Sequence, residues 1–424
     1  MQKKIKLSII IGASLLVWFV FFPNNEEPTP AITYTIEHFN EDGCEIYREI
    51  ADLAAKRSDY PKALEFYNKS LEYKPDNLTT YDRMGITHEQ SNNLNAALKT
   101  YFKALSISSN FKEERFRKDI EIKQEFNANL GISLKDSTAW TGVQPLKDKT
   151  ILVYTEKGLG DTLQFCRFLP QLVGRGAKVL FKPQNSLVAL LKQSPLGVTI
   201  IDSSSNAQEY QNTHIDYYVS LLQLPYFLDI CLQDCIAHKK YLTVQTQHIQ
   251  NFKKLFTQNT FNIGITWQGD PTHINDKNRS LQLAHFYNLC RIPGIQVYSL
   301  QKFAGHEQLK NVPDDISIID LDEHINDFAD TAAIIENLDL VISVDTAIAH
   351  LAGALEKQVF LLTPYISDWR WLDHYAQEQQ VWYKNVKKIK QDKPRSWLPV
   401  FNKLNKLVAV AKQDAMHELD CIKS

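Results

Sequence analysis

The sequence predicts an α/β protein with two Rossmann-like lobes, preceded by an all-α module of helical repeats. From residue 150 onward, short apolar and β-branched runs alternate with helical stretches, and this alternation restarts near residue 261. Before residue 129, tyrosine and alanine positions instead recur at an interval of 34 residues. A chain of 424 residues is also too long for one ordinary core, so several domains are expected.

The composition is that of a globular chain. Apolar residues make up 44%, charged residues 23% and aromatic residues 11%, which argues against disordered and multi-pass membrane classes. The net charge of −2 means that the chain has no overall excess of positive charge with which to bind nucleic acid. No nucleic-acid partner is therefore expected. The six cysteines are too dispersed for a disulfide framework. Cys231, Cys235 and His238 could share a helix face with a metal ion, but no fourth ligand accompanies them, so we interpret them as ordinary side chains.

Residues 1–22 predict a membrane anchor or a signal segment. Lysines precede an apolar run from Leu7 to Phe22, whose 16 residues would span about 24 Å as a helix. Bulky aromatic residues stand where a cleavage site would lie, which favours an uncleaved single anchor over a signal peptide. The bacterial inner membrane is the expected location, and the basic residues would send the rest of the chain outward. Residues 23–43 are polar and contain prolines, which predicts a linker.

A repeat of 34 residues follows the linker. Its matching positions are Tyr47, Ala63 and Tyr67 in one unit, and Tyr81, Ala97 and Tyr101 in the next. Small alanines let two antiparallel helices approach closely, and aromatic side chains fill the groove beside them. Pro75 would end the second helix of the first unit, because proline has no N–H to donate.

The repeat resembles the tetratricopeptide repeat, with two units at 44–77 and 78–111 and a capping helix at 112–128. The first unit departs from the family pattern at Ala51 and Ser70. Two units are fewer than a free-standing array needs, so a docking or spacer role is expected. Repeats of this family also bind protein partners, which is the alternative role.

Residues 129–250 and 251–424 predict one parallel sheet each, because near-continuous apolar strands separated by helices are typical of sheets covered on both faces. The expected strands are 151–154, 178–181, 198–201 and 215–219 in the first lobe, and 261–266, 295–299, 316–320, 340–344 and 359–362 in the second. The polar stretch 245–260 predicts a hinge. Ligand loops of such lobes lie at the carboxyl ends of the strands, so the site is expected in the cleft between the lobes.

The first loop whose residues suit ligand binding or catalysis runs from Glu156 to Thr162. It contains Gly158, Gly160 and Asp161. Glycines allow close backbone approach, and the N-terminus of the following helix attracts anions. The spacing is neither a dinucleotide fingerprint nor a P-loop. Asp161 could also simply cap its helix.

The second loop follows the strand 340–344 and carries Asp345, Thr346, His350 and Gly353. A carboxylate, a hydroxyl and an imidazole would converge at one helix start, where backbone N–H groups attract an anion such as a nucleotide diphosphate. The alternatives are that Asp345 is only a helix cap and that His350 is a buried core histidine.

These loops resemble the heptosyltransferase-like glycosyltransferases of family 9 that carry tetratricopeptide repeats. The resemblance rests on residues 156–167, 264–280, 298–302, 345–353 and 364–371, and it covers about residues 140–385 in order. It implies the GT-B fold and catalysis without a metal ion or another cofactor. It also implies a nucleotide-diphosphate sugar as the donor substrate.

The resemblance assigns Asp161 as the catalytic base, on the acceptor loop that contains Gly158 and Gly160. It assigns donor binding to Thr266, Lys277, Arg279, Gln301, Asp345, Thr346, His350 and Gly353. Either Lys277 or Arg279 would neutralise the leaving phosphate. Asp320 and Asp322 mimic the metal-binding D-x-D motif of the other glycosyltransferase fold, but here we interpret them as a polar strand end.

The implied reaction is metal-independent inverting transfer of a sugar to a hydroxyl of a glycan, lipid or protein acceptor, in cell-surface glycan or protein glycosylation. The alternative is a non-catalytic, membrane-anchored repeat scaffold with a relic GT-B domain. An outward topology favours that alternative, because bacterial nucleotide sugars would be absent outside the membrane. A GT-B epimerase or phosphorylase is a further rival.

Overall fold

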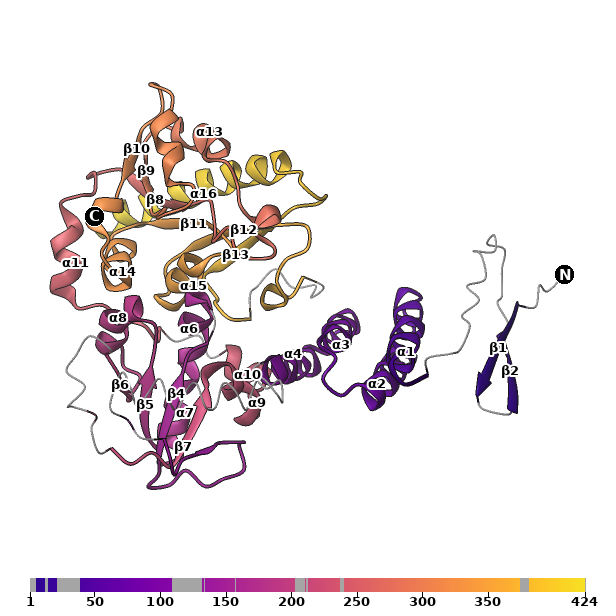
Figure 1. The fold of residues 1–424 in the computed structure, drawn as a ribbon. Helices are drawn as coiled ribbons and strands as arrows, with labels where there is room; N and C mark the ends of the chain where they lie inside the picture. The colour runs from indigo at the N-terminus through magenta and orange to yellow at the C-terminus, as the bar shows by residue number, and fades with distance from the viewer. Residues whose placement is uncertain are drawn as a thin grey trace. The chain divides into compact units, whose positions relative to one another are not determined.

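The computed structural model describes residues 5–11, 14–20, 39–108, 132, 134–156, 158–202, 210, 213–236, 240–373 and 381–423. The chain divides into two compact units, residues 1–80 and 81–424. Helices α1 and α2 belong to the first unit, and the second unit contains two parallel sheets with their helices (Figure 1). The division falls within the second predicted repeat, 78–111.

The hydrophobic N-terminal segment forms two strands and not the predicted helix. Strand β1 (Ile5–Ile11) pairs antiparallel with β2 (Ser14–Val20). Isoleucine recurs in β1 and valine in β2, and such β-branched residues favour extended backbone. Within the described ranges, no helix is long and apolar enough to cross a membrane. The structure has strands at residues 5–11 and 14–20, where a membrane-spanning helix was predicted.

Four helices occupy the region of the predicted repeats: α1 (Phe39–Lys56), α2 (Tyr60–Tyr73), α3 (Leu78–Gln90) and α4 (Leu94–Ser108). The Asp59 carboxylate caps α2 by accepting from the Lys62 backbone N–H at 3.4 Å. The repeat positions Ala63 and Ala97 are fully buried, as are Tyr67 and Tyr101 apart from a few per cent. The predicted capping helix 112–128 lies outside the described residues, and so does most of the linker 23–43.

The first lobe is built on a five-stranded parallel sheet in the order β3-β7-β4-β5-β6. Its strands are β3 (Thr138–Ala139), β4 (Thr150–Tyr154), β5 (Lys178–Lys182), β6 (Thr199–Ile200) and β7 (Tyr217–Ser220). Helices α6 (Leu159–Phe165), α7 (Leu169–Gly174) and α8 (Val188–Gln193) lie between them. In β4, Ile151 and Val153 enter one apolar cluster and Leu152 enters another, so both faces of the sheet are covered.

The second lobe is built on a six-stranded parallel sheet in the order β10-β9-β8-β11-β12-β13. Its strands are β8 (Phe261–Thr266), β9 (Ile295–Ser299), β10 (Ile318–Asp320), β11 (Leu340–Val344), β12 (Val359–Thr363) and β13 (Val386–Lys390). Counted along the chain this is the 3-2-1-4-5-6 order of a Rossmann fold, whose ligand crevice opens where the order reverses, between β8 and β11. The two predicted Rossmann-like lobes are confirmed.

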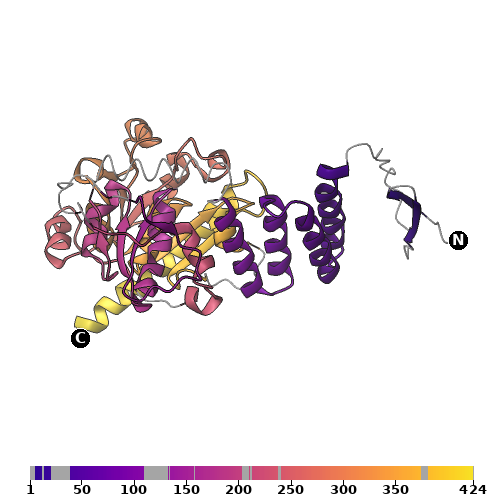
Figure 2. The same ribbon diagram turned by 60° about the horizontal axis from the view of Figure 1, so that its bottom comes forward.

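Helices from both lobes meet between the sheets. Helix α15 (Ala347–Ala354) of the second lobe contacts α6 of the first (Figure 1). One hydrophobic cluster includes buried residues of α4, of the first lobe and of the α15 side of the second lobe. The opposite face of the second sheet is covered by the C-terminal helix α16 (Leu398–Lys423), drawn in yellow in Figure 2. The lobes therefore share a core, and α11 (Thr246–Lys253) occupies the predicted hinge.

Candidate active site

Asp161 lies at the start of α6, on the side of the first lobe that faces the second. One of its carboxylate oxygens accepts from the Gly158 backbone N–H at 3.0 Å, so Asp161 does cap the helix. The other oxygen forms an ion pair with the Arg370 guanidinium of the second lobe. The carboxylate thus both caps α6 and connects the lobes.

Gly160 brings the backbone of α6 against α15. A Cβ atom at this position would lie 3.0 Å from His350 Cδ2 and 3.6 Å from Ala347 Cα. A larger residue here would therefore require the His350 ring to shift. Gly158, in contrast, has only the Asp161 carboxylate near its Cβ position, at 3.6 Å.

His350 is buried on α15 and held on two sides. Its Nδ1 lies 3.0 Å from the Tyr383 hydroxyl, and its ring stacks on Trp371 with 5.1 Å between centroids. Burial, together with the nearby cations Arg370 and Arg167, lowers the pKa of His350 to about 3. The imidazole is therefore neutral at physiological pH and available as a hydrogen-bonding group.

Gly353 and Thr346 have supporting positions on the same helix. A Cβ atom on Gly353 would lie 2.7 Å from the Tyr383 ring, so this glycine makes room for the tyrosine that contacts His350. Thr346 stands at the N-cap of α15, but its hydroxyl lies 3.0 Å from the Ser343 hydroxyl and does not cap the helix.

Asp345 and Asp368 are neighbouring carboxylates whose pKa values are shifted in opposite directions. Burial raises the pKa of Asp345 to about 6, and the negative charge of Asp368 adds to this effect. Burial alone would raise the pKa of Asp368 as well, but its ion pair with Arg370 at 2.8 Å lowers it. Neighbouring carboxylates whose pKa values are shifted apart are typical of functional sites.

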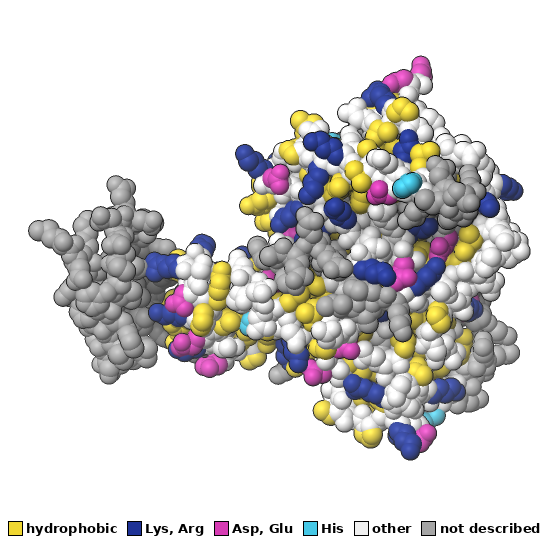
Figure 3. Space-filling view, turned by 180° about the vertical axis from the view of Figure 1, so that it is seen from behind, with side chains coloured by type: hydrophobic (Ala, Val, Ile, Leu, Met, Phe, Trp, Pro, Cys, Tyr) yellow, Lys and Arg dark blue, Asp and Glu magenta, His cyan; other side chains and the backbone are white. Residues whose placement is uncertain are grey.

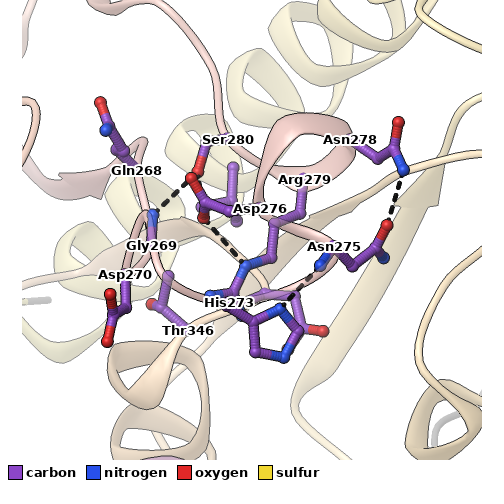
Figure 4. Close-up of polar contacts among 12 residues, drawn as sticks. Gln268, Gly269, Asp270, His273, Asn275, Asp276, Asn278, Arg279, Ser280 and Thr346 are labelled. Carbon is purple, nitrogen blue, oxygen red and sulfur yellow. Dashed lines mark hydrogen bonds and ion pairs between the residues drawn. The ribbon is translucent and has the colours of Figure 1, made fainter.

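The loop after β8 carries Arg279 on a network of its own residues (Figure 4). The Asp276 carboxylate accepts from the Ser280 hydroxyl at 2.7 Å and from Arg279 Nε at 3.3 Å. Arg279 Nη1 donates to the Asp345 carbonyl at 2.8 Å, which connects this loop to the turn before α15. A Cβ atom on Gly269 would lie 2.6 Å from Arg279 Nη2, so the loop backbone covers the guanidinium. Lys277, two residues before Arg279, is exposed.

Gln301 is a positioning residue in this structure. Its Oε1 accepts from the backbone N–H groups of Trp267 and Gln268, each at 3.0 Å. Its Nε2 donates to the carbonyls of Gln268, Lys302 and Ala304. With both ends of the amide engaged, Gln301 fixes the loops after β8 and β9 to each other.

Two buried hydroxyls stand at strand ends near the β8–β11 crevice. Thr266 Oγ1 at the end of β8 and Thr363 Oγ1 at the end of β12 have no hydrogen-bond partner within the described residues. Thr266 alternates with Ile265 and Trp267, which belong to the α16-side core, so its side chain points to the α15 side. Buried polar groups are usually paired, so these hydroxyls are candidates for ligand contact.

Three residues of this region were not predicted as site residues. Arg370 and Asp368 follow β12, and Arg167 lies in the 3-10 helix η1 (Cys166–Phe168). Arg167 donates to the Trp382 carbonyl at 3.0 Å and to the Tyr241 hydroxyl at 2.9 Å. The signal for Arg370 was its position between two tryptophans just beyond a strand, but the sequence alone does not pair it with Asp161, 209 residues away.

The acidic pair that resembles a metal motif in the sequence is engaged in other contacts. Asp320 lies 2.7 Å from His306 Nε2 and accepts from the Asp322 backbone N–H, and Asp322 pairs with Lys302 at 2.7 Å. Burial raises the pKa of Cys235 to about 12, so this cysteine is a thiol, and His238 lies outside the described residues. No group of three or more metal-ligating side chains comes together in the part of the chain that the structure describes.

One segment of the second lobe is strongly basic. Between residues 384 and 412 there are nine lysines and arginines and one acidic residue, Asp392. Figure 3 shows Lys and Arg side chains gathered over the upper lobe on the face seen from behind. A basic surface raises the local concentration of anionic ligands.

Comparison with known proteins gives distant similarities. No family model matches the chain. Protein FlbA of Caulobacter vibrioides is 23% identical over 298 residues, which cover 65% of this chain and 48% of FlbA. The chain therefore spans about half the length of the curated relative it matches.

Among solved structures, a glycosyl transferase family 9 protein of Veillonella parvula has a TM-score of 0.47 at 11% identity, covering 65% of this chain and 99% of that chain. The ADP-heptose lps heptosyltransferase II of E. coli has a TM-score of 0.49 at 12% identity, covering 63% and 99%. Because these similarities are weak, the function is inferred from the chain's own geometry.

Proposed function

We propose that this chain is a nucleotide-sugar-dependent glycosyltransferase of the GT-B type. The observation that carries the proposal is the meeting of two strand–turn–helix loops between two Rossmann-like lobes. Asp161 at the start of α6 faces the start of α15, where Asp345, Thr346 and His350 lie. Each loop lies at the carboxyl edge of its own parallel sheet, where ligands of such folds bind.

The second lobe is proposed to hold the donor. The N-terminus of α15 would attract the diphosphate, and Thr346, His350 and the unpaired Thr266 hydroxyl supply polar contacts. Arg279 is the better placed of the two proposed loop cations, because its guanidinium contacts the Asp345 carbonyl, whereas Lys277 is exposed. Asp345 and Gln301 hold the surrounding loops, and Gly353 positions His350 through Tyr383.

The proposed reaction is a single displacement without a metal ion. Asp161 accepts the proton of an acceptor hydroxyl while its oxygen forms a bond to the anomeric carbon. The bond from that carbon to the diphosphate breaks on the opposite side, so the configuration inverts and a nucleotide diphosphate leaves. Basic side chains and the α15 N-terminus stabilise the charge that develops on the leaving phosphate.

Asp161→Asn tests this proposal. The variant should lose sugar transfer or donor hydrolysis by about 100-fold or more, because general-base catalysis contributes this much. It should still bind nucleotide diphosphate, seen as a rise in melting temperature with ligand. Full-length protein would be assayed with ADP-, UDP- and GDP-sugars, including ADP-heptose, the donor that the E. coli protein's name specifies. Turnover that survives the substitution would refute the assignment of the base.

The second candidate function is a non-catalytic scaffold, and one observation favours it. The Asp161 carboxylate is occupied on both sides, by the Gly158 N–H and by Arg370. A relic domain would retain such contacts for stability alone. No donor turnover by the wild type with any of the sugars above, together with normal folding, would support this candidate.

We propose further that α1–α4 are two tetratricopeptide repeats in a docking or spacer role. Supporting this, matching positions are buried in both halves, and Gly85 lies directly against the Tyr101 ring, where a Cβ atom would come within 2.2 Å. Residues 7–22 are proposed to associate with the bacterial inner membrane. Protease protection of the full chain in membrane vesicles tests that location and determines on which side the lobes lie.

A further inference from the structure

Arg370 joins the two lobes at the point where the proposed base lies. It belongs to the 3-10 helix η8 (Trp369–Trp371), which follows β12. Its Nη2 pairs with Asp161, and its Nε donates to Gln164 Oε1 at 3.0 Å, so two of its contacts are on α6 of the first lobe. Its Nη1 donates to Asp368 Oδ1 at 2.8 Å. Every guanidinium nitrogen therefore has an acceptor, and only 13% of the side chain is exposed.

The loop that carries Arg370 is fixed at both of its ends. The backbone N–H and the hydroxyl of Ser367 both donate to the Asp373 carboxylate, each at 2.8 Å. Lys388 and Lys390 of β13 pair with the same carboxylate at 3.1 and 2.8 Å. A change of partner at Arg370 therefore requires rotation of its side chain and no movement of the loop.

The guanidinium is also close to the start of α15. Its positive charge acts on Asp345, and the adjacent Trp371 stacks on His350 at 5.1 Å. This is the helix start that the proposed function gives to the donor diphosphate. A guanidinium binds phosphate oxygens in bidentate fashion, and a diphosphate carries more charge than a carboxylate. An arriving diphosphate would thus compete directly with Asp161 for Arg370.

We propose that Arg370 is a latch that exchanges Asp161 for the donor diphosphate. This inference rests on the proposed function and deepens it. Before the donor binds, the Asp161 carboxylate is ion-paired with Arg370. Asp161 could accept a proton only if this ion pair were broken. Once the diphosphate has taken the guanidinium, Asp161 is free to accept the proton of the acceptor hydroxyl. Donor binding thereby activates the base, and Arg370 is a positioning residue for the base as well as a ligand for the donor.

The decisive variant is again Asp161→Asn, now measured for binding. Asparagine keeps an oxygen for the Gly158 N–H but removes the charge that holds Arg370. The ligand is whichever of ADP, UDP and GDP binds the wild type most tightly. The latch predicts that Asp161→Asn binds this nucleoside diphosphate about fivefold more tightly than the wild type does. Inorganic pyrophosphate should show the same gain, because the exchange involves only the diphosphate. Isothermal titration calorimetry of the full-length protein measures these constants.

Two further variants complete the test. Arg370→Gln should weaken diphosphate binding about tenfold, and the gain from Asp161→Asn should be absent in the double variant. Arg370→Lys should recover part of the loss, which a purely structural role for the side chain would not give. Asp315→Asn is the matched control, since it removes a surface carboxylate paired with Arg291 at 2.8 Å, and it should leave binding unchanged.

The outcomes separate the two proposals. If the wild type binds a nucleoside diphosphate and Asp161→Asn binds it equally or more weakly, the latch is wrong and the glycosyltransferase proposal stands. If neither a nucleoside diphosphate nor pyrophosphate binds any folded variant, the proposed function fails and the latch fails with it. A gain that persists in the double variant would show that Arg370 is not the group that Asp161 restrains.

Discussion

At the scale of single residues, Asp345 and His350 share one short segment, and burial shifts their proton affinities in opposite directions. The pKa of Asp345 rises from 3.8 to about 6, and that of His350 falls from 6.5 to about 3. A carboxyl whose pKa is raised by folding costs stability as the pH rises above the unfolded value, and the full cost is present above the folded value. A histidine whose pKa is lowered costs stability as the pH falls below 6.5, because only the unfolded chain then takes up the proton.

Asp345→Asn should therefore stabilise the fold at neutral pH. Each unit of pKa is worth about 1.4 kcal/mol, and partial exposure reduces this, so we expect a gain of about 2 kcal/mol at pH 7.5. The gain should shrink as the pH falls from 6 towards 4, where the wild-type carboxyl is protonated. Urea unfolding of both proteins across this range measures it.

A difference between the two proteins that does not change with pH would contradict the assigned cause. Asp315→Asn, on an exposed ion pair, is again the control and should give little change at either pH.

The site residues could be predicted only in part, for a physical reason. Glycines, hydroxyls and carboxylates at strand ends are visible in a sequence, and the family resemblance then assigned roles to Asp161 and Asp345. The partner of a charge is not visible when it comes from another lobe, so Arg370 was missed. Gln301 was predicted to bind the donor, and the sequence did not indicate that backbone groups occupy both ends of its amide.

At the scale of elements, α3 and α4 pack closely because Gly85 leaves room for an aromatic ring. A Cβ atom on Gly85 would lie 2.2 Å from Tyr101 Cε1. The Tyr101 hydroxyl donates to Glu89 at 2.5 Å, which holds the ring in place. On its other side Tyr101 packs against Trp369, with ring centroids 5.0 Å apart.

Gly85→Ala should destabilise the protein by about 1–2 kcal/mol, although alanine is the better helix former. Overpacking costs about 1–3 kcal/mol and exceeds the gain of up to about 1 kcal/mol in helix propensity. Gly174→Ala, in α7, is the matched control, because nothing lies within 4 Å of its Cβ position. The control should be neutral or stabilising in thermal unfolding. Equal shifts in melting temperature for the two variants would show that the close contact between Gly85 and Tyr101 does not contribute to stability.

Strands were predicted well where both faces are buried and poorly elsewhere. Nine expected strands appear, because a continuous apolar run has few alternatives between covering helices. Strand β13 was missed because its sequence, Val-Lys-Lys-Ile-Lys, is mostly polar, as suits the edge of a sheet. The N-terminal run was predicted as a helix on length and hydrophobicity, which do not distinguish a helix from a pair of β-branched strands.

At the scale of the whole second unit, Arg167 helps to hold the two lobes together. Its guanidinium lies 4.5 Å from the Tyr241 ring and 4.7 Å from the Tyr383 ring. Its three donor groups reach the Gln164 carbonyl, the Trp382 carbonyl and the Tyr241 hydroxyl. A planar guanidinium makes all these contacts at once, and an ammonium group does not.

Arg167→Lys should therefore cost about 2 kcal/mol of stability, although the charge is kept. Arg175→Lys is the matched control, since Arg175 is exposed and makes one hydrogen bond, to the Leu228 carbonyl at 3.2 Å. Urea unfolding measures both. Equal losses in the two variants would show that the stacked geometry of Arg167 contributes nothing.

The shared core that runs from α4 into both lobes sets the limits for exchanging parts of this protein. Phe102 on α4 packs on Trp369 and Trp382, and Trp382 in turn packs on Phe165 of the first lobe. A graft that begins at residue 129, where the lobes begin in sequence, would leave these aromatic rings facing solvent. The compact unit that contains these contacts begins at residue 81, so a transferable module has to include α4 together with the lobes.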